Sequence, residues 1–253
     1  TGKTPLSIYI YNFLKKKRFK PSITRKYYKT HFDEINLTKK RVGRFFKNKN
    51  RITAIEEAQK KGSNVVIMDD GFQDFSIKKD LNIICFNSID AAGNGLMLPA
   101  GPLREPLKNL REAQIVIING KRNKNFENKI KSLSRNTEVF YSQYIIRKKL
   151  NFKNKKFLAF AGIGNPESFF NLLKENKLNI KQKLTFPDHY SYTKNDIKNI
   201  VLEAKKKNLK LITTEKDFYR IKYLGLKKID YISVDLKIFK NKSFEQEILK
   251  YLW

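Results

Sequence analysis

Short apolar runs alternate with amphipathic segments along the chain, and this alternation constrains the fold more than any other feature. Runs typical of buried strands occur at Val65–Asp69, Asn82–Phe86, Ile115–Asn119, Phe157–Ala161, Leu209–Thr213 and Tyr231–Val234. Helical patterns occur at Leu6–Lys16, Ile52–Lys61, Pro166–Lys174 and Asn195–Lys207. Parallel strands need crossover connections, which are usually helices. This order therefore predicts an α/β protein with a mostly parallel sheet.

The stretch Thr137–Lys156 breaks this alternation. Residues Glu138–Ile146 alternate as a strand does, and a polar turn around Asn151–Lys156 leads back to a second apolar run. We interpret this stretch as a β-ribbon that joins two lobes. The predicted domains are residues 1–150, and a second, smaller α/β lobe at residues 151–253.

Composition limits the class of protein without selecting a function. A chain of 253 residues with 40% hydrophobic residues can bury a core. It contains no apolar run of the roughly 18 residues that a membrane span needs. The only cysteine, Cys85, excludes an internal disulfide and suits a reducing cytoplasm. The net charge of +30 fits either solvated basic faces or attraction to nucleic acid, a phosphorylated substrate or an acidic membrane.

The first four residues, Thr1-Gly2-Lys3-Thr4, match the end of a GxxxxGK[ST] phosphate loop. Such a loop presents backbone N–H groups to phosphates at the start of a helix. Its lysine reaches the β- and γ-phosphates, and its Ser or Thr hydroxyl binds Mg²⁺. These four residues are therefore candidates for ATP binding, with Thr4 also a metal ligand.

A second signal strengthens the nucleotide hypothesis. The apolar run Val65–Met68 ends in two carboxylates, Asp69 and Asp70, as a Walker B strand does. Acids at this point hold Mg²⁺ directly or through water. The alternative is an ordinary strand followed by an acidic turn, because Asp70-Gly71 is also a turn dipeptide.

Longer motifs carry a specific resemblance. They are Asp69-Asp70-Gly71-Phe72-Gln73, the loop from Gly93 to Pro106 (GNGLMLPAGPLREP), Ala161–Pro166 (AGIGNP), Phe186–Tyr190 (FPDHY) and Thr213–Asp217 (TTEKD). In this order they resemble the tetraacyldisaccharide 4′-kinases of lipid A synthesis. The resemblance implies a P-loop fold and ATP-dependent, Mg²⁺-dependent phosphorylation of the 4′-hydroxyl of a tetraacylated glucosamine disaccharide 1-phosphate.

The resemblance also implies roles at the acceptor hydroxyl. Asp33-Glu34 resembles the family's GDE motif with Phe32 in place of the glycine. Asp33 would then be the base, assisted by His189, while Glu34 would help to organise Mg²⁺. The alternative for His189 is a turn residue that caps the following helix. Arg25 would neutralise charge on the transferred phosphoryl group, and His31 is interpreted as a surface residue.

The Gly- and Pro-rich loop is longer than a βα connector requires, which favours a binding role. The alternative is a loop that only covers the sheet. By resemblance, the candidate substrate-binding residues are Gln73, Asn94 and Arg104. Asp74 stands where the family usually has histidine, so a role for that position does not carry over.

The resemblance further implies a peripheral, monomeric protein on the cytoplasmic face of the bacterial inner membrane, with an anionic glycolipid as substrate. The family's N-terminal amphipathic segment and the first half of its phosphate loop are missing from the chain, which is expected to be a fragment or the product of a late start. Two rival hypotheses are a nucleic-acid-associated P-loop ATPase, suggested by the charge, and a nonenzymatic remnant. No RNA-binding signature supports the first.

Overall fold

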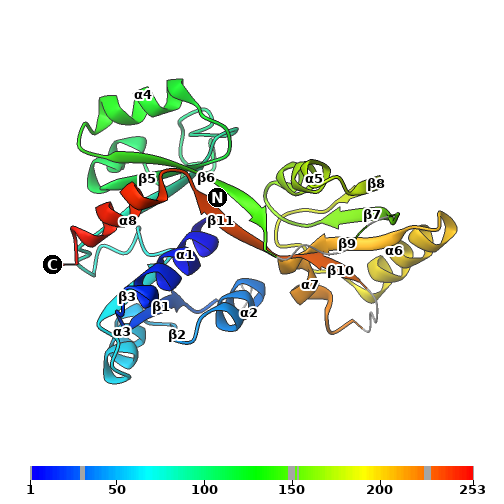
Figure 1. Cartoon of the computed structure of the whole chain (residues 1–253), viewed down its shortest axis with the longest axis horizontal. Helices are drawn as coiled ribbons and strands as arrows, with labels where there is room; N and C mark the ends of the chain where they lie inside the picture. The colour runs from blue at the N-terminus through cyan, green and yellow to red at the C-terminus, as the bar shows by residue number, and fades with distance from the viewer. Residues whose placement is uncertain (1, 29–31, 148–151, 153, 225–228, 253) are drawn as a thin grey trace. The chain divides into compact units, whose positions relative to one another are not determined.

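A computed structural model describes residues 2–28, 32–147, 152, 154–224 and 229–252 (Figure 1). Contacts divide the chain into two compact units. Unit 1 comprises residues 1–26, 44–144 and 236–253, and unit 2 comprises residues 27–43 and 145–235. Among the described residues, no helix is both long enough and apolar enough to span a membrane.

Unit 1 contains two sheets. The first has the parallel order β2-β1-β3, formed by Phe45–Asn48, Pro21–Lys26 and Val65–Asp69. The second has the order β11-β6-β5-β4, formed by Val234–Ile238, Glu138–Ile146, Ile115–Asn119 and Ile83–Asn87. Strands β4, β5 and β6 are parallel. The helices are α1 (Lys3–Lys16), α3 (Arg51–Lys60), the 3₁₀ helix η1 (Leu107–Glu112), α4 (Lys124–Leu133) and α8 (Asn241–Leu249).

Helix α1 supplies one side of the unit 1 core. Its residues Leu6, Ile10, Phe13 and Leu14 are buried, as their helical spacing predicts. They pack in one cluster with residues of β3, β4, β5 and α8. Because α1 is held along its length, the position of its first turn is set by the core.

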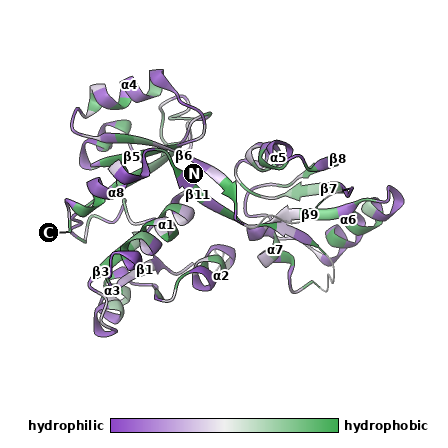
Figure 2. Ribbon diagram, in the orientation of Figure 1, coloured by the Kyte–Doolittle hydropathy of each residue, from purple (hydrophilic) through white to green (hydrophobic). Residues whose placement is uncertain are grey.

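Unit 2 contains one parallel sheet of order β10-β9-β7-β8. Its elements are α2 (Phe32–Arg41), β7 (Lys156–Ala161), α5 (Pro166–Glu175), β8 (Asn179–Thr185), α6 (Lys194–Lys206), β9 (Lys210–Thr214), α7 (Glu215–Ile221) and β10 (Asp230–Ile232). Figure 1 shows α5 on one side of the sheet and α7 on the other. Helix α6 shows hydrophobic and hydrophilic bands (Figure 2), and its apolar face packs against β7 and β9.

The mostly parallel α/β architecture is confirmed, but the partner expected for the strand Glu138–Ile146 is wrong. Strand β6 does not pair with the apolar run after residue 156, because that run is β7 and belongs to the unit 2 sheet. Its partner is β11, which runs antiparallel. The hydrogen bonds Phe239 N to Tyr141 O and Arg147 N to Ser233 O, both 2.9 Å, fix this direction. Within the polar turn expected around Asn151–Lys156, Asn151 and Lys153 lie outside the described residues, and Lys155 N donates to Phe152 O at 3.2 Å, as a turn does.

The expected strand Tyr231–Val234 is also wrong, since it contains the end of β10 and the start of β11, in different sheets. The division by contacts is discontinuous in sequence, whereas the expectation was a single boundary after residue 150. Strand β1 was not expected because Ser22, Thr24 and Arg25 interrupt its apolar pattern, yet all three are buried.

Candidate functional site

The first turn of α1 presents the two residues expected to hold a nucleotide. Gly2 precedes the helix with φ of 89°, a left-handed conformation that favours glycine. Lys3 and Thr4 then begin the helix, and glycine has no side chain to cap their turn. The N–H groups of a helix start carry partial positive charge and bind anions. Thr1 lies outside the described residues.

Strand β3 brings two carboxylates to this helix start. The Thr4 hydroxyl donates to Asp69 Oδ2 at 3.0 Å, and Ser7 Oγ lies 3.3 Å from Asp69 Oδ1. Lys3 Nζ donates to Asp70 Oδ1 at 2.5 Å. The expected phosphate-loop and Walker B residues therefore meet within unit 1.

Arg25 joins the same cluster from the neighbouring strand. In the β1–β3 register Arg25 lies opposite Asp69. Its Nη1 donates to Asp69 Oδ2 at 2.6 Å and to Thr4 Oγ1 at 3.3 Å. The side chains of Arg25 and Asp69 are 5% and 1% exposed, so this ion pair is almost inaccessible to solvent. The arginine predicted to stabilise the phosphoryl group thus contacts two of the candidate metal ligands, Thr4 and Asp69.

Asp70 lies between two cations. Burial acts to raise its pKa, but the positive charges and hydrogen bonds of Lys3 and Arg104 outweigh burial and lower it. Arg104 Nη1 lies 3.2 Å from both carboxylate oxygens. The carboxylate therefore remains ionised at neutral pH, and the long loop reaches the cluster through Arg104.

Arg51 supports this cluster from the first turn of α3. It is buried and donates to the carbonyl oxygens of Asp69 and Asp70 at 3.3 and 2.5 Å. Its Nε lies 3.3 Å from Asp74 Oδ2. Asp74 thus pairs with the arginine that holds the end of β3, which gives a structural role to the aspartate that replaces the family's usual histidine.

A separate cluster lies in unit 2 around Arg220, at the end of α7. Its Nη2 donates to Asp33 Oδ2 at 2.6 Å and lies 3.3 Å from His189 Nδ1. Asp33 is in the first turn of α2 and is 2% exposed. His189 lies in a turn with φ of 57°, which is uncommon outside glycine. The two residues predicted to act on the acceptor hydroxyl are therefore held by one guanidinium.

Asp217 organises this cluster and is fully buried. Its carboxylate accepts hydrogen bonds from Gly162 N–H at 3.1 Å, the Tyr192 hydroxyl at 3.2 Å, the Thr214 hydroxyl at 2.7 Å and Arg220 Nη1 at 3.0 Å. Burial, with the charge and hydrogen bond of Asp217, raises the pKa of Tyr192. The AGIGNP motif, the TTEKD motif and Tyr192, which are separated in the sequence, thus converge on one carboxylate.

Comparison with known proteins assigns the family. The family model described as tetraacyldisaccharide-1-P 4′-kinase matches residues 32–252. The chain belongs to the tetraacyldisaccharide 4′-kinase family. The tetraacyldisaccharide 4′-kinase of Pelagibacter ubique is 41% identical over 99% of this chain and 80% of its own length. That of Rickettsia bellii is 32% identical over 87% of this chain and 73% of its own length.

A solved structure supports the same fold. LpxK from Aquifex aeolicus, solved in complex with ATP, superposes with a TM-score of 0.70 and 22% identity. The match covers all of this chain and 85% of that one. The chain is therefore an α/β protein of the P-loop type and, as a tetraacyldisaccharide 4′-kinase family member, a phosphotransferase. These comparisons do not favour the nucleic-acid-dependent ATPase.

The other residues proposed by resemblance to the tetraacyldisaccharide 4′-kinases do not contact either cluster through a hydrogen bond described above. Glu34 Oε1 binds Lys216 Nζ at 2.5 Å in unit 2. Gln73 is exposed in the turn after β3. Asn94 shapes its own loop, with Nδ2 donating to Ala100 O at 2.8 Å and Oδ1 accepting from Leu96 N at 3.1 Å. His31, expected at the surface, lies outside the described residues.

The sequence analysis did not identify Arg51 or Arg220, nor Asp217 as the carboxylate that accepts hydrogen bonds from several motifs. Asp217 is the last residue of the TTEKD motif, and Arg220 follows it by three positions. That spacing places both on one helix face, which was an available signal. The alternative reading of His189 as a helix cap finds no support, because Thr193 and Asp196 form the capping box of α6.

Proposed function

We propose that this kinase transfers the γ-phosphoryl group of ATP to the 4′-hydroxyl of a tetraacylated glucosamine disaccharide 1-phosphate. The observation that carries the proposal is the meeting of Lys3 and Thr4, at a helix start, with Asp69 and Asp70, at the end of a parallel strand. Unit 1 then handles the nucleotide, and unit 2 supplies the groups that act on the acceptor.

On the nucleotide side, the amides of the first α1 turn and the Lys3 ammonium bind phosphate oxygens. Lys3 exchanges its contact with Asp70 for one with phosphate, and Arg104 remains to balance the Asp70 carboxylate. Arg25 places a further positive charge at the same cluster, where it would neutralise charge that develops on the transferred group.

The residues present fit a magnesium ion. Thr4 Oγ1 and Asp69 Oδ2 are hard oxygen donors 3.0 Å apart, of the kind that Mg²⁺ prefers alongside water and phosphate. The Arg25 cation already lies against both oxygens, which marks the pair as a place for positive charge. Thr4 and Asp69 would hold the ion, which would supply positive charge against the phosphates. Asp70 would act through the metal's water ligands, and a metal role for Glu34 requires it to leave Lys216.

On the acceptor side, Asp33 is the proposed base. Its Oδ2 is bound to Arg220, and its other carboxylate oxygen remains for the proton of the sugar hydroxyl. His189 is held through Nδ1 by the same guanidinium, and its Nε2, which lies 4.0 Å from Asp188 Oδ1, is the atom proposed to assist Asp33. A positioned base is worth about 10²–10⁴ in rate.

The positive charge of the chain suits this substrate, which carries a phosphate and sits among acidic lipids. We propose peripheral, electrostatic association of a monomer with the cytoplasmic face of the inner membrane. Gln73 and Asn94 remain proposed substrate contacts. The long loop that contains Asn94 also exposes Leu96, Met97 and Leu98, and these apolar side chains suit contact with acyl chains.

The experiment that tests the function is phosphoryl transfer from γ-labelled ATP to tetraacyldisaccharide 1-phosphate, with the product position assigned by NMR. Lys3→Ala removes the phosphate contact, and Lys15→Ala changes an exposed lysine in the last turn of the same helix. We expect 4′-labelled product from the parent and from Lys15→Ala, and little from Lys3→Ala. ATP hydrolysis stimulated by RNA, with no labelled glycolipid, would favour the rival ATPase.

A further inference from the structure

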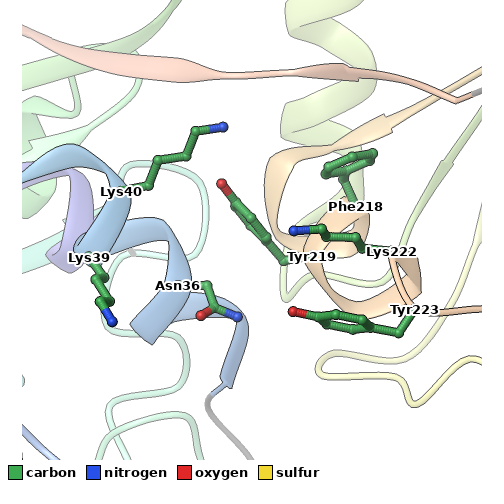
Figure 3. A pocket seen from close by; sticks show the side chains of 7 residues that line it. All are labelled: Asn36, Lys39, Lys40, Phe218, Tyr219, Lys222 and Tyr223. Atoms are coloured by element: carbon green, nitrogen blue, oxygen red, sulfur yellow. The ribbon is translucent and has the colours of Figure 1, made fainter.

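A basic pocket of about 300 Å³ lies within unit 2 between α2 and the end of α7. Its lining residues are Asn36, Lys39, Lys40, Phe218, Tyr219, Lys222 and Tyr223. None of them belongs to the acceptor cluster around Arg220. Figure 3 shows Lys40 and Asn36 on the α2 side and the aromatic rings on the α7 side.

The charges around this pocket are not balanced. Within the described part of the chain, no carboxylate forms an ion pair with Lys39, Lys40 or Lys222. The Lys40 ammonium lies 5.9 Å from the centre of the Tyr219 ring, and this neighbour raises the pKa of Lys40. Lys222 extends towards α2, whereas Lys39 points away from the other two (Figure 3). Lys40 is therefore held as a cation, and Lys222 adds a second basic side chain to the same pocket, so the pocket suits an anion.

Tyr219 adds an independent indication of a ligand. The residue is 7% exposed, and its buried hydroxyl, although near enough to Lys40 to raise the pKa of that ammonium, makes no hydrogen bond of normal length and angle among the described residues. Buried polar groups usually have partners, and those without one call for an explanation. Figure 3 shows this hydroxyl directed towards Lys40. A phosphate oxygen that enters between Lys40 and Lys222 would supply the missing partner.

The pocket continues the face of α2 that carries Asp33. Residues 33, 36 and 40 have spacings of three and four, so they lie along one side of the helix. At a rise of 1.5 Å per residue, Asn36 is about 4.5 Å and Lys40 about 10 Å along the axis from Asp33. A disaccharide that places its 4′-hydroxyl at Asp33 carries its 1-phosphate on the other sugar, at the far end of the molecule.

We propose that the pocket between Lys40, Lys222 and Tyr219 binds the phosphate monoester that the acceptor glycolipid already carries. This assignment rests on the proposed function, since it takes Asp33 as the site of the acceptor hydroxyl. The lysines supply charge-assisted hydrogen bonds to the phosphate, Asn36 an amide donor, and the rings of Phe218 and Tyr223 an apolar wall for the sugar.

Direct binding tests the pocket without using kinase activity. Calorimetry and NMR would compare glucosamine 1-phosphate with glucosamine on the parent chain and on Lys40→Gln, Lys222→Gln and Tyr219→Phe. Lys206→Gln, an exposed lysine at the end of α6, is the control. Loss of one charge-assisted contact should weaken binding of the sugar phosphate about tenfold. The control and the glucosamine measurements should not change.

Kinetics then tests the link to the reaction. With tetraacyldisaccharide 1-phosphate, Lys40→Gln and Lys222→Gln should raise KM about tenfold and leave kcat nearly unchanged. With the same acceptor lacking the 1-phosphate, parent and variants should have equal KM. Equal losses on both acceptors would overturn the proposal, because the pocket would then not recognise phosphate.

Two further arms identify the source of the phosphate. If inorganic phosphate alone binds as tightly as the sugar phosphate, the sugar is not recognised and the assignment to the acceptor is wrong. If the variants lose binding to phosphatidylglycerol vesicles but bind glucosamine 1-phosphate normally, the pocket is a lipid headgroup site and the assignment is also wrong. If the pocket variants lose sugar-phosphate binding as expected but the parent chain shows no kinase activity, the pocket is supported as a phosphate site. The proposed function is then the hypothesis that is rejected.

Discussion

Arg220 donates a hydrogen bond to Asp33 at 2.6 Å, and both side chains are nearly buried, at 11% and 1% exposure. The same guanidinium also bonds Asp217 and lies 3.3 Å from His189. One arginine thus fixes the proposed base, the histidine that assists it and the carboxylate that organises the surrounding motifs.

Replacement of Arg220 should therefore cost stability as well as rate. Arg220→Ala leaves Asp33 and Asp217 as buried, poorly compensated charges, and we expect a loss of about 3–5 kcal/mol in the free energy of unfolding. Arg122→Ala, which removes an exposed ion pair with Glu127, should cost less than about 1 kcal/mol. Urea denaturation measures both, and similar small losses would show that Arg220 does not hold the cluster together.

Asp33 and His189 should behave as one functional unit. Asp33→Asn and His189→Ala should each lower kcat by about 10²–10⁴, and the double variant should lose much less than the product of the two. Affinity for Mg-ATP, measured by calorimetry, should change little. His31→Ala, at the chain's other histidine, and Glu167→Gln, at an exposed carboxylate, are the controls. Near-normal kcat in either single variant would remove that residue from the mechanism.

The pKa of Asp70 should depend on Lys3. In the folded chain it lies below its ordinary value of 3.8, since Lys3 and Arg104 outweigh burial. The contribution of this pairing to stability is therefore complete above pH 3.8 and is lost as the pH falls through the lower folded value. In Lys3→Ala only Arg104 remains, so the pKa should rise and the loss should begin at higher pH. Carboxyl NMR titration measures the shift, with Lys15→Ala as the unchanged control.

Asp74 should act only through Arg51. Asp74→His, which restores the residue usual in the family, should cost up to about 1 kcal/mol of stability and leave kcat close to the parent value. Arg51→Ala removes donors from two carbonyls at the end of β3 and should cost about 1–3 kcal/mol, with weaker Mg-ATP binding. Asp80→His, at an exposed aspartate, is the matched control. A large kcat loss in Asp74→His alone would indicate a direct role for Asp74.

The charge of +30 should serve membrane contact. Vesicles that contain acidic lipids should retain the chain at low ionic strength and release it as salt rises, because exposed charges are screened beyond about 8 Å at 0.15 M salt. Neutral vesicles are the control. Tight RNA binding that survives moderate salt, without retention by vesicles, would be the opposite result.

Local pattern in the sequence predicted much of the fold. The apolar faces of α1 and α6, and the apolar runs that became β3, β5 and β7, were each identifiable because periodicity reports which face of an element is buried. The contacts of Lys3 and Thr4 with Asp69 and Asp70, the proposed nucleotide site, were also predictable. These residues belong to two short motifs, and a P-loop fold requires these motifs to meet.

The tertiary structure alone decided which distant residues became partners. Asp33 and Arg220 are separated by 187 positions, and β6 pairs with β11 instead of the neighbouring apolar run. The buried polar strand β1, the Arg51–Asp74 pair and the pocket between Lys40 and Lys222 likewise follow from packing. Periodicity encodes burial of a face but not the identity of the element that covers it, because that choice depends on the free energy of the whole packed unit.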